Sequence, residues 1–394
     1  MRCKIMSEKA FKGSTGYWVW MLFLLSIMGV GGLCYVQQFN YGLGITGMSR
    51  DVTWGVYISQ FTFLVGVAAG GLMLVLPYYL HNYKAFGRIV ILGEFMAIAA
   101  IAMCLMFIIA DLGQPMRAMN VLLHPTPHSM LFWDMIVLNG YLFLNVLCGW
   151  VVLQSEYKGI KYPKWIKPFI YLSIPWAISI HTVTAFLYCG LPGRHFWLTA
   201  ILAPRFLASA FAAGPSLLMV IAMILKRTTK FDVGREAQDK LVTIIGYAAM
   251  LNFFFLGCEF FVAYYSQIPG HMHTLDYLFW GISHGDQVYN NLVPFMRASV
   301  VMGLAGIGLI FVSRAKQSDT LLVISCLLIF FAFWIDKGLG LVLGGFVPSM
   351  LDQVTEYYPS AQEIGITAAI WATGFFILSI LYKVAISVKL EKEA

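Results

Sequence analysis

The sequence predicts an all-α polytopic membrane protein with ten transmembrane helices, and its composition, apolar runs and charge distribution all indicate this. Of 394 residues, 60% are hydrophobic and 11% are charged, whereas a soluble domain is about 45–50% apolar and roughly 25% charged. Runs long enough to cross a bilayer, about 20 residues each, lie near 17–37, 54–80, 88–111, 128–153, 168–190, 197–226, 241–266, 288–313, 320–341 and 364–386. The whole chain, 1–394, is therefore expected to form a single membrane domain.

The lysine and arginine residues alternate sharply between the two sides of this ten-span map. Twenty of the 26 fall on the side that holds both termini, and six fall on the other side: Arg50, Arg117, Arg194, Arg205, Arg297 and Lys337. Because short cytoplasmic loops carry an excess of Lys and Arg, both termini are predicted to be cytoplasmic. The net charge of +7 reflects this bias and does not indicate nucleic-acid binding.

Two segments of similar sequence indicate an internal repeat. Span 2 contains Phe-Leu-Val-Gly-Val-Ala-Ala-Gly at 63–70, and span 6 contains Phe-Leu-Ala-Ser-Ala-Phe-Ala-Ala-Gly at 206–214. Small residues at such spacing let helices approach closely. The similarity predicts two four-helix bundles, 54–190 and 197–341, with flanking helices at 17–37 and 364–386. The alternative is that Ala- and Gly-rich packing segments recur by chance.

Cysteine and histidine give no pattern that binds a redox metal. The seven cysteines include no Cys-x-x-Cys pair, and of the eight histidines His181 alone lies deep within a predicted span. A transmembrane haem with two axial histidines needs a partner at matching depth. We therefore expect no haem, iron–sulfur cluster or other metal in this chain. The sequence also lacks Walker and dinucleotide-binding motifs.

The connector between spans 3 and 4, residues 111–134, gathers polar side chains at one membrane boundary. It holds Asp111, Arg117, His128 and Asp134 together with Trp133. Polar groups at membrane depth are costly and usually mark a site. The structural alternatives are that Asp111 only caps a turn and that Arg117 and Asp134 form an interfacial ion pair.

Other polar residues lie within the predicted spans. His181 is past the midplane toward the outer side, Gln60 is in the first turns of span 2, and further residues lie at other depths: Glu94, Asn145, Asn252 and Glu259. An ionisable group in the membrane is expensive to keep, which favours a functional role for His181 over a structural hydrogen bond. For Gln60, Glu94 and Glu259 a structural role is equally compatible with the sequence.

These motifs resemble those of the NrfD/polysulfide-reductase family of integral membrane subunits. The resemblance is carried by Asp-Leu-Gly-Gln-Pro at 111–115, Ser-Met-Leu-Phe-Trp-Asp at 129–134 and Gly-Leu-Pro-Gly-Arg-His-Phe-Trp at 190–197. The segment Leu-Ala-Pro-Arg-Phe-Leu-Ala-Ser at 202–209 is also similar. With ten spans, the chain looks most like the DsrP/HmeB-type subunit of the sulfate-reducer Dsr transmembrane complex.

The resemblance implies a quinone-interacting subunit in the cytoplasmic membrane of a prokaryote. It implies a bound, exchangeable menaquinone or menaquinol in the outer half of the first bundle, surrounded by membrane lipid. Electrons would pass to or from a periplasmic ferredoxin-like iron–sulfur subunit, with further cytochrome and membrane redox subunits in the complex. Oxidoreductase activity would then belong to the complex, as in anaerobic respiration such as sulfate reduction.

Quinone chemistry requires an apolar groove, hydrogen-bond donors for two ring oxygens, and groups that exchange protons. The candidate catalytic residues are Asp111, His181 and Asp134. The candidate cofactor-binding residues are Gln60, Asp111, Arg117, His128, Trp133 and Asp134. A proton path toward the cytoplasm would use Glu94, Asn145, His181, Asn252 and Glu259. No metal ligands are expected.

Two other functions remain compatible with such a chain. One is a proton or small-anion transporter, which would concentrate polarity and broken helices at the midplane, whereas here polarity is concentrated at the outer boundary. The other is a passive membrane anchor for redox subunits, which would leave Asp111 and His181 without a role.

Overall fold

A computed structural model describes residues 13–349 and 353–393. Within these residues, ten helices are long and apolar enough to cross a membrane, which confirms the predicted all-α polytopic class. Their helical segments are α2 (Thr15–Tyr41), α3 (Val56–Gly70) with α4 (Leu72–Leu80), α5 (Val90–Asp111), α7 (Met130–Tyr157), α8 (Lys167–Cys189), α9 (Leu202–Thr228), α10 (Arg235–Tyr265), α12 (Val293–Lys316), α13 (Asp319–Phe333) and α15 (Ala361–Glu393).

Short elements connect these spans. A π-helix, η6 (Trp334–Gly340), and α14 (Leu341–Gly344) continue α13. The distal connection between α10 and α12 contains α11 (Pro269–Phe279) and a small hairpin of β1 (Ile282–His284) and β2 (Gln287–Tyr289). The remaining elements are η1 (Gly42–Ile45), η2 (Lys84–Arg88), η3 (Pro115–Arg117), α6 (Asn120–Leu123), η4 (Lys164–Ile166) and η5 (His195–Trp197).

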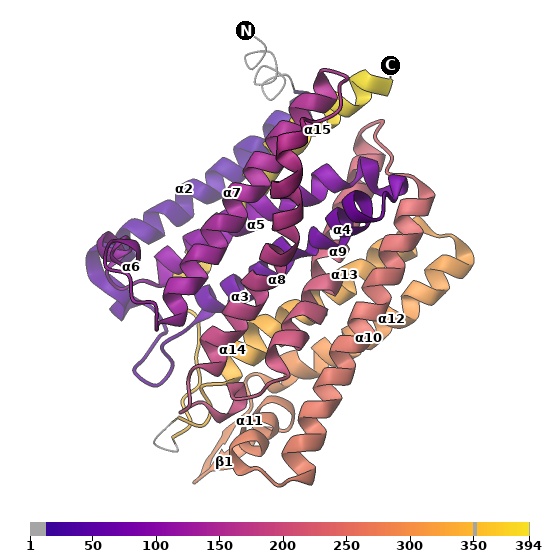
Figure 1. The fold of residues 1–394 in the computed structure, drawn as a ribbon. Coiled ribbons are helices and arrows are strands. Elements are labelled where there is room, and N and C mark those ends of the chain that lie inside the picture. Colours follow the sequence, from indigo (N-terminus) through magenta and orange to yellow (C-terminus); the bar gives the residue numbers. More distant parts are fainter. Residues whose placement is uncertain (1–12, 350–352, 394) are drawn as a thin grey trace.

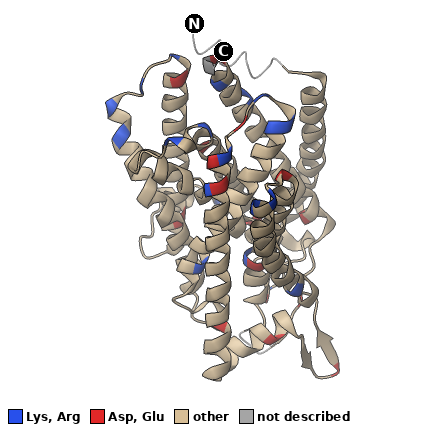
Figure 2. Cartoon of the chain, turned by 90° about the vertical axis from the view of Figure 1, so that its right-hand side faces the viewer, with Lys and Arg blue, Asp and Glu red and all other residues tan. Residues whose placement is uncertain are grey.

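The start of α2 and the end of α15 lie at the same end of the molecule, and α11 and β1 lie at the opposite end (Figure 1). We call these ends the terminal face and the distal face. Figure 2 shows most of the Lys and Arg positions in the half that carries the terminal face. This distribution is the one expected if the terminal face is cytoplasmic; the orientation in the membrane stays a prediction.

The two segments of the sequence repeat meet each other in the structure. α3 packs against α9, and Gly70 and Gly214 form their closest approach. A Cβ atom on Gly70 would lie 2.6 Å from the Cα of Gly214, so the backbones touch without intervening side chains. Such contacts between small residues hold membrane helices together by close van der Waals packing.

The remaining helices pack around this central contact. α5, α7 and α8 lie on the side of α3, while α10, α12 and α13 lie on the side of α9 (Figure 1). The flanking helices α2 and α15 pack on each other, and α15 also packs on α5 and α7. The division into bundles 54–190 and 197–341 is compatible with these contacts and stays a prediction.

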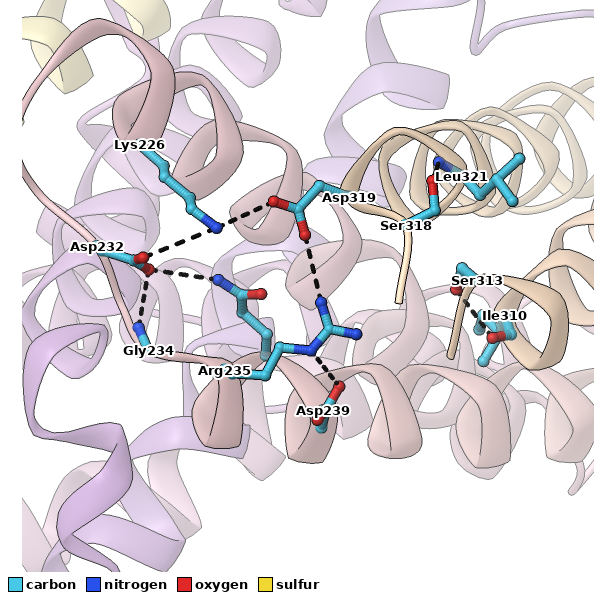
Figure 3. Close-up of polar contacts among 11 residues, drawn as sticks. Lys226, Asp232, Gly234, Arg235, Asp239, Ile310, Ser313, Ser318, Asp319 and Leu321 are labelled. Atoms are coloured by element: carbon cyan, nitrogen blue, oxygen red, sulfur yellow. Dashed lines mark hydrogen bonds and ion pairs between the residues drawn. The ribbon is translucent and has the colours of Figure 1, made fainter. Parts of the chain in front are cut away.

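A group of charged side chains ties the α9–α10 connection to the start of α13 on the terminal face (Figure 3). Asp319 accepts hydrogen bonds from Nζ of Lys226 at 3.0 Å and from Nη1 of Arg235 at 3.3 Å. Asp232 approaches the same lysine at 3.7 Å. Exposed ion pairs contribute only about 0–1 kcal/mol each, so this group orders the connection more than it stabilises the fold.

Candidate functional site

The inner face of α8 presents three buried polar side chains, His181, Thr184 and Tyr188, at helical spacing. Thr184 donates a hydrogen bond to Oδ1 of Asp134 on α7 at 2.8 Å. The hydroxyl of Tyr188 is hydrogen-bonded to that of Thr62 on α3. These contacts connect α8 to α7 and α3 near their distal ends, and they bring two candidate catalytic residues, Asp134 and His181, to one region.

His181 is the unusual member of this group. It is 1% exposed, and neither of its ring nitrogens has a hydrogen-bond partner among the described residues. Buried polar atoms in folded proteins are nearly always hydrogen-bonded, and at membrane depth water does not routinely replace a missing partner. His181 therefore has the free hydrogen-bonding capacity expected of a residue that contacts a ligand.

Asp134 lies in the second turn of α7 and is buried. The structure brings it to Thr184 and not to Arg117, which is exposed on η3 and makes no ion pair with Asp134 in the described chain. The interfacial ion pair between Arg117 and Asp134 is therefore not formed.

Asp111 ends α5 beside a second buried carboxylate, Glu363 of α15, with which it interacts electrostatically. Its Oδ1 is buried without a hydrogen-bond partner. Glu363, in contrast, accepts hydrogen bonds from the backbone N–H groups of Gly47 at 2.7 Å and Ser360 at 2.8 Å. It also accepts a hydrogen bond from the hydroxyl of Tyr357 at 2.5 Å. Burial raises the pKa of Tyr357, and the contact with Glu363 raises it further, so the phenol keeps its proton.

Sequence reasoning missed Glu363, although a local signal was present. Ser360 and Glu363 have the Ser-x-x-Glu spacing of a capping box. The Glu363 side chain accepts from the Ser360 N–H, and the Glu363 N–H donates to Oγ of Ser360 at 3.3 Å. This box fixes the start of α15 beside Asp111.

Gln60 joins α3 to two other segments through its side-chain oxygen. Oε1 accepts hydrogen bonds from the indole N–H groups of Trp334 at 2.9 Å and Trp371 at 3.0 Å. Its acceptor is therefore occupied by η6 and α15. The contacts are those of a residue that orients neighbouring helices, and a role in ligand binding stays a prediction.

Four aromatic rings lie on the distal side of His181 and Thr184. Trp54 stacks on Trp197 at 5.6 Å between ring centroids, and Tyr188 and Phe346 contact both indoles edge-on. The indole N–H of Trp197 donates to the carbonyl of Leu341 at 2.8 Å. This aromatic cluster separates the buried polar groups from the distal surface.

The other connector residues lie at the surface. His128 is exposed, and Trp133 is 42% exposed and donates its indole N–H to the carbonyl of Pro127 at 2.8 Å. The structure does not bring Arg117, His128 or Trp133 together with His181. Their assignment to a binding site stays a prediction.

Two residues of the predicted proton path meet between α5, α7 and α8 on the terminal side. Glu94 and Asn145 line one small cavity together with Tyr141, Cys148 and Ser173. Oε2 of Glu94 is buried without a partner. Nearby, Nζ of Lys389 lies 3.2 Å from Oε2 of Glu156, and both residues interact electrostatically with Glu94.

Two others, Asn252 and Glu259, lie on α10, apart from that cavity. Oδ1 of Asn252 on α10 is buried without a partner. Glu259 is paired with Arg205 of α9, whose Nη2 donates to Oδ1 of Asp336 at 2.7 Å. Arg205 thus joins two carboxylates in a buried ion-pair cluster.

Sequence reasoning also missed Lys337, which was counted as an outer-loop residue. The structure places it on η6 and 4% exposed, where it interacts electrostatically with His181. The available signal was a lysine next to an aspartate at the end of an otherwise apolar span. Polar pairs in such positions are rarely exposed to lipid.

The ten membrane-spanning helices and the polar side chains buried between them define a polytopic membrane protein with a polar interior. The family model described as "Polysulphide reductase, NrfD" matches residues 44–335, so the chain belongs to this family, as its motifs predicted.

Curated relatives of this chain are membrane subunits of redox complexes. A putative membrane subunit of dimethyl sulfoxide reductase from Halobacterium salinarum is 26% identical over 94% of this chain and 86% of its own length. The menaquinone reductase integral membrane subunit of Nitratidesulfovibrio vulgaris is 21% identical over 93% and 91%. An Hdr-like menaquinol oxidoreductase integral membrane subunit of Archaeoglobus fulgidus is 24% identical over 62% and 60%.

A solved structure of bd oxidase from Geobacillus thermodenitrificans shares the fold. It superposes with a TM-score of 0.53 at 12% sequence identity, and the match covers 93% of this chain and 98% of that chain. At this identity the likeness concerns the arrangement of helices alone.

Proposed function

We propose that this protein is the quinone-interacting membrane subunit of a respiratory redox complex. It exchanges electrons between menaquinol or menaquinone and a periplasmic iron–sulfur subunit. The two protons that menaquinol releases, or that menaquinone takes up, pass through side chains of this protein. The family and the names of two relatives, a menaquinone reductase subunit and a menaquinol oxidoreductase subunit, support the choice of quinone.

The observation that carries the proposal is His181. A buried imidazole with two free nitrogens, one helical turn from Thr184 and its bond to Asp134, fits a ligand that presents a carbonyl or hydroxyl oxygen. Imidazole can donate to a quinone oxygen or accept from a quinol hydroxyl, since each ring nitrogen takes either role. Of the two phenylalanines on α3, Phe63 packs against Phe330, and side chains at i and i+2 of a helix point to different sides, so Phe61 is the one we expect to contact the ring.

Menaquinone, when bound, supplies a two-electron and two-proton couple. In this proposal His181 binds a ring oxygen and holds or gives up its proton, which is the usual task of an active-site histidine. Asp134 is fixed by Thr184 and sets the charge next to that proton. Asp111, with its free Oδ1 beside Glu363, is the second group able to take a proton.

The iron–sulfur partner is what the family resemblance implies, and relatives named as membrane subunits of reductases support a redox partner in general. The distal face is where we expect it to dock, because the candidate site lies nearer that face. Proton exchange with the terminal face would use Glu94 and Asn145, which share a cavity close to Lys389 and Glu156.

A binding titration tests the proposal. The native complex, purified in lipid, is titrated with the fluorescent quinone analogue 2-heptyl-4-hydroxyquinoline N-oxide. We expect His181→Ala and Asp134→Asn each to weaken binding by about tenfold or more, since a lost hydrogen bond to a buried polar group costs on the order of 1–3 kcal/mol.

Matched controls are His81→Ala and Asp286→Asn, which change exposed residues at the terminal face and in the hairpin. Both should bind the analogue as the unchanged complex does. If the unchanged complex binds no analogue, the proposal is wrong and the protein is better explained as a passive membrane anchor. Equal affinity in all four variants would show that neither His181 nor Asp134 contacts the quinone analogue.

A further inference from the structure

The π-helix η6 directs two neighbouring charged residues to different helices. Oδ1 of Asp336 accepts a hydrogen bond from Arg205 of α9 at 2.7 Å, while Nζ of Lys337 lies beside Gly66 of α3. A Cβ atom at residue 66 would lie 3.2 Å from that nitrogen, so the glycine leaves room for the ammonium group. π-turns of this kind occur frequently at functional sites.

The two cations of this region differ in their partners. Arg205 contacts the carboxylates of Glu259 and Asp336. Lys337 makes one long hydrogen bond, 3.5 Å to the carbonyl of Phe206, and its Nζ lies 4.2 Å from the centroid of the Phe206 ring. No carboxylate lies within ion-pair distance of Lys337 in the described chain. A buried ammonium without a direct counter-ion is costly, and such groups readily give up their proton.

Charge balance links Lys337 to the ion-pair cluster. Arg205, Asp336 and Glu259 together carry a net charge of −1 when all three are ionised, and a protonated Lys337 brings the sum to zero. Transfer of that proton to one of the carboxylates leaves the sum at zero. The proton can thus move from the lysine to the cluster without a change in the net charge of this low-dielectric region.

We propose that Lys337 is the proton-exchanging residue that connects the quinone site of the first bundle to the Arg205–Asp336–Glu259 cluster of the second bundle. The inference rests on the proposed function. When a quinol at the site gives two electrons to the iron–sulfur partner and becomes a quinone, Lys337 would pass its proton to a carboxylate of the cluster and be reprotonated through His181 by one quinol proton. The other quinol proton would pass to Asp111. The ionisable groups close enough to interact electrostatically with Lys337 are His181, Cys104, Asp336 and Arg205.

Two cavities lie between the cluster and the distal face. Arg205 and Asp336 line a cavity of about 10 Å³, which is close to the space that one water molecule needs. Phe196 lines this cavity and also a cleft of about 490 Å³ whose walls include His195 and His273. Phe196 therefore lies between the ion-pair cluster and the distal cleft.

The test compares Lys337→Met with Lys337→Arg in the native complex. Arginine keeps the positive charge but does not lose its proton in proteins, so it separates proton exchange from charge alone. We expect both variants to bind the quinone analogue within about threefold of the unchanged complex, and both to lower turnover with 2,3-dimethyl-1,4-naphthoquinol by about tenfold or more. Lys226→Met, in the terminal-face group of Figure 3, is the matched control and should leave both values unchanged.

The possible outcomes distinguish the role of Lys337 from the existence of the quinone site. Restored turnover in Lys337→Arg, or full turnover in Lys337→Met, overturns the role of Lys337 while analogue binding still supports the quinone site. An unchanged complex that binds no analogue overturns both. If Lys337→Met does not assemble, Lys337→Gln, which keeps a polar group, carries the same prediction.

Discussion

At the residue scale, the buried polar groups of this protein fall into satisfied and unsatisfied ones, and the distinction points to function. Glu363 and Gln60 have full sets of partners for their carbonyl or carboxylate oxygens, and they fix the positions of helices. His181 and Asp111 keep buried atoms without partners. Because an orphaned polar atom in the membrane costs free energy, these are the residues that we assign to ligand binding and proton exchange.

Arg205 is a buried charged residue with carboxylate partners, and we expect its role to be structural. Its guanidinium group contacts Glu259 and Asp336, and its side chain is 8% exposed. Arg205→Met would leave two buried carboxylates without a cation, and removal of one partner from a buried ion pair destabilises proteins by about 3–5 kcal/mol. We expect a clear fall in the thermal unfolding temperature of the detergent-solubilised protein.

Arg50→Met is the control, because Arg50 is 77% exposed. An Arg205→Met protein that unfolds at the same temperature as the Arg50→Met protein would contradict the structural role of the ion-pair cluster.

At the element scale, the contact of α3 with α9 holds the two halves of the molecule together. The residues that make it were visible in the sequence, since the small side chains at 63–70 and 206–214 predicted close helix packing. The π-helix was not predictable in the same way. The contacts of Asp336 with α9 and of Lys337 with α3 depend on tertiary packing.

Gly70→Leu tests the central contact. Its Cβ would meet the Cα of Gly214 at 2.6 Å, and backbone atoms cannot move aside as a flexible side chain can. Overpacking typically costs about 1–3 kcal/mol, so we expect a lowered unfolding temperature and a smaller yield of folded protein. Gly29→Leu on α2, where a Cβ meets nothing within 4 Å, should be tolerated. Equal stability of the two variants would contradict the close approach.

At the scale of the whole molecule, composition and hydropathy were sufficient to predict the class and the number of spans. The candidate site was predictable only in part. Asp134 and His181 stood out as ionisable groups within spans, and both are buried, whereas Thr184 and Tyr188, which bond to Asp134 and Thr62, carry no distinguishing sequence signal. The exposed positions of His128 and Trp133 could not be known from the sequence, because loop conformation is set by contacts with distant segments.

The asymmetry of basic residues predicts the orientation of the molecule. With the terminal face in the cytoplasm, green fluorescent protein fused to the C-terminus should fluoresce. Alkaline phosphatase inserted after Asp286, in the exposed hairpin of the distal face, should be active because it folds only in the periplasm. An inactive phosphatase at Asp286 together with an active one at the C-terminus would reverse the orientation.

The most direct test of the central claim is photo-crosslinking with a menaquinone analogue that carries a diazirine on its ring. After irradiation of the native complex, mass spectrometry of the digested protein identifies the labelled peptides. We predict labelling of α8 around His181 and of the first turns of α7 around Asp134, with competition by unlabelled menaquinone. Competable labelling confined to α10 and α12 would contradict a quinone site in the first bundle.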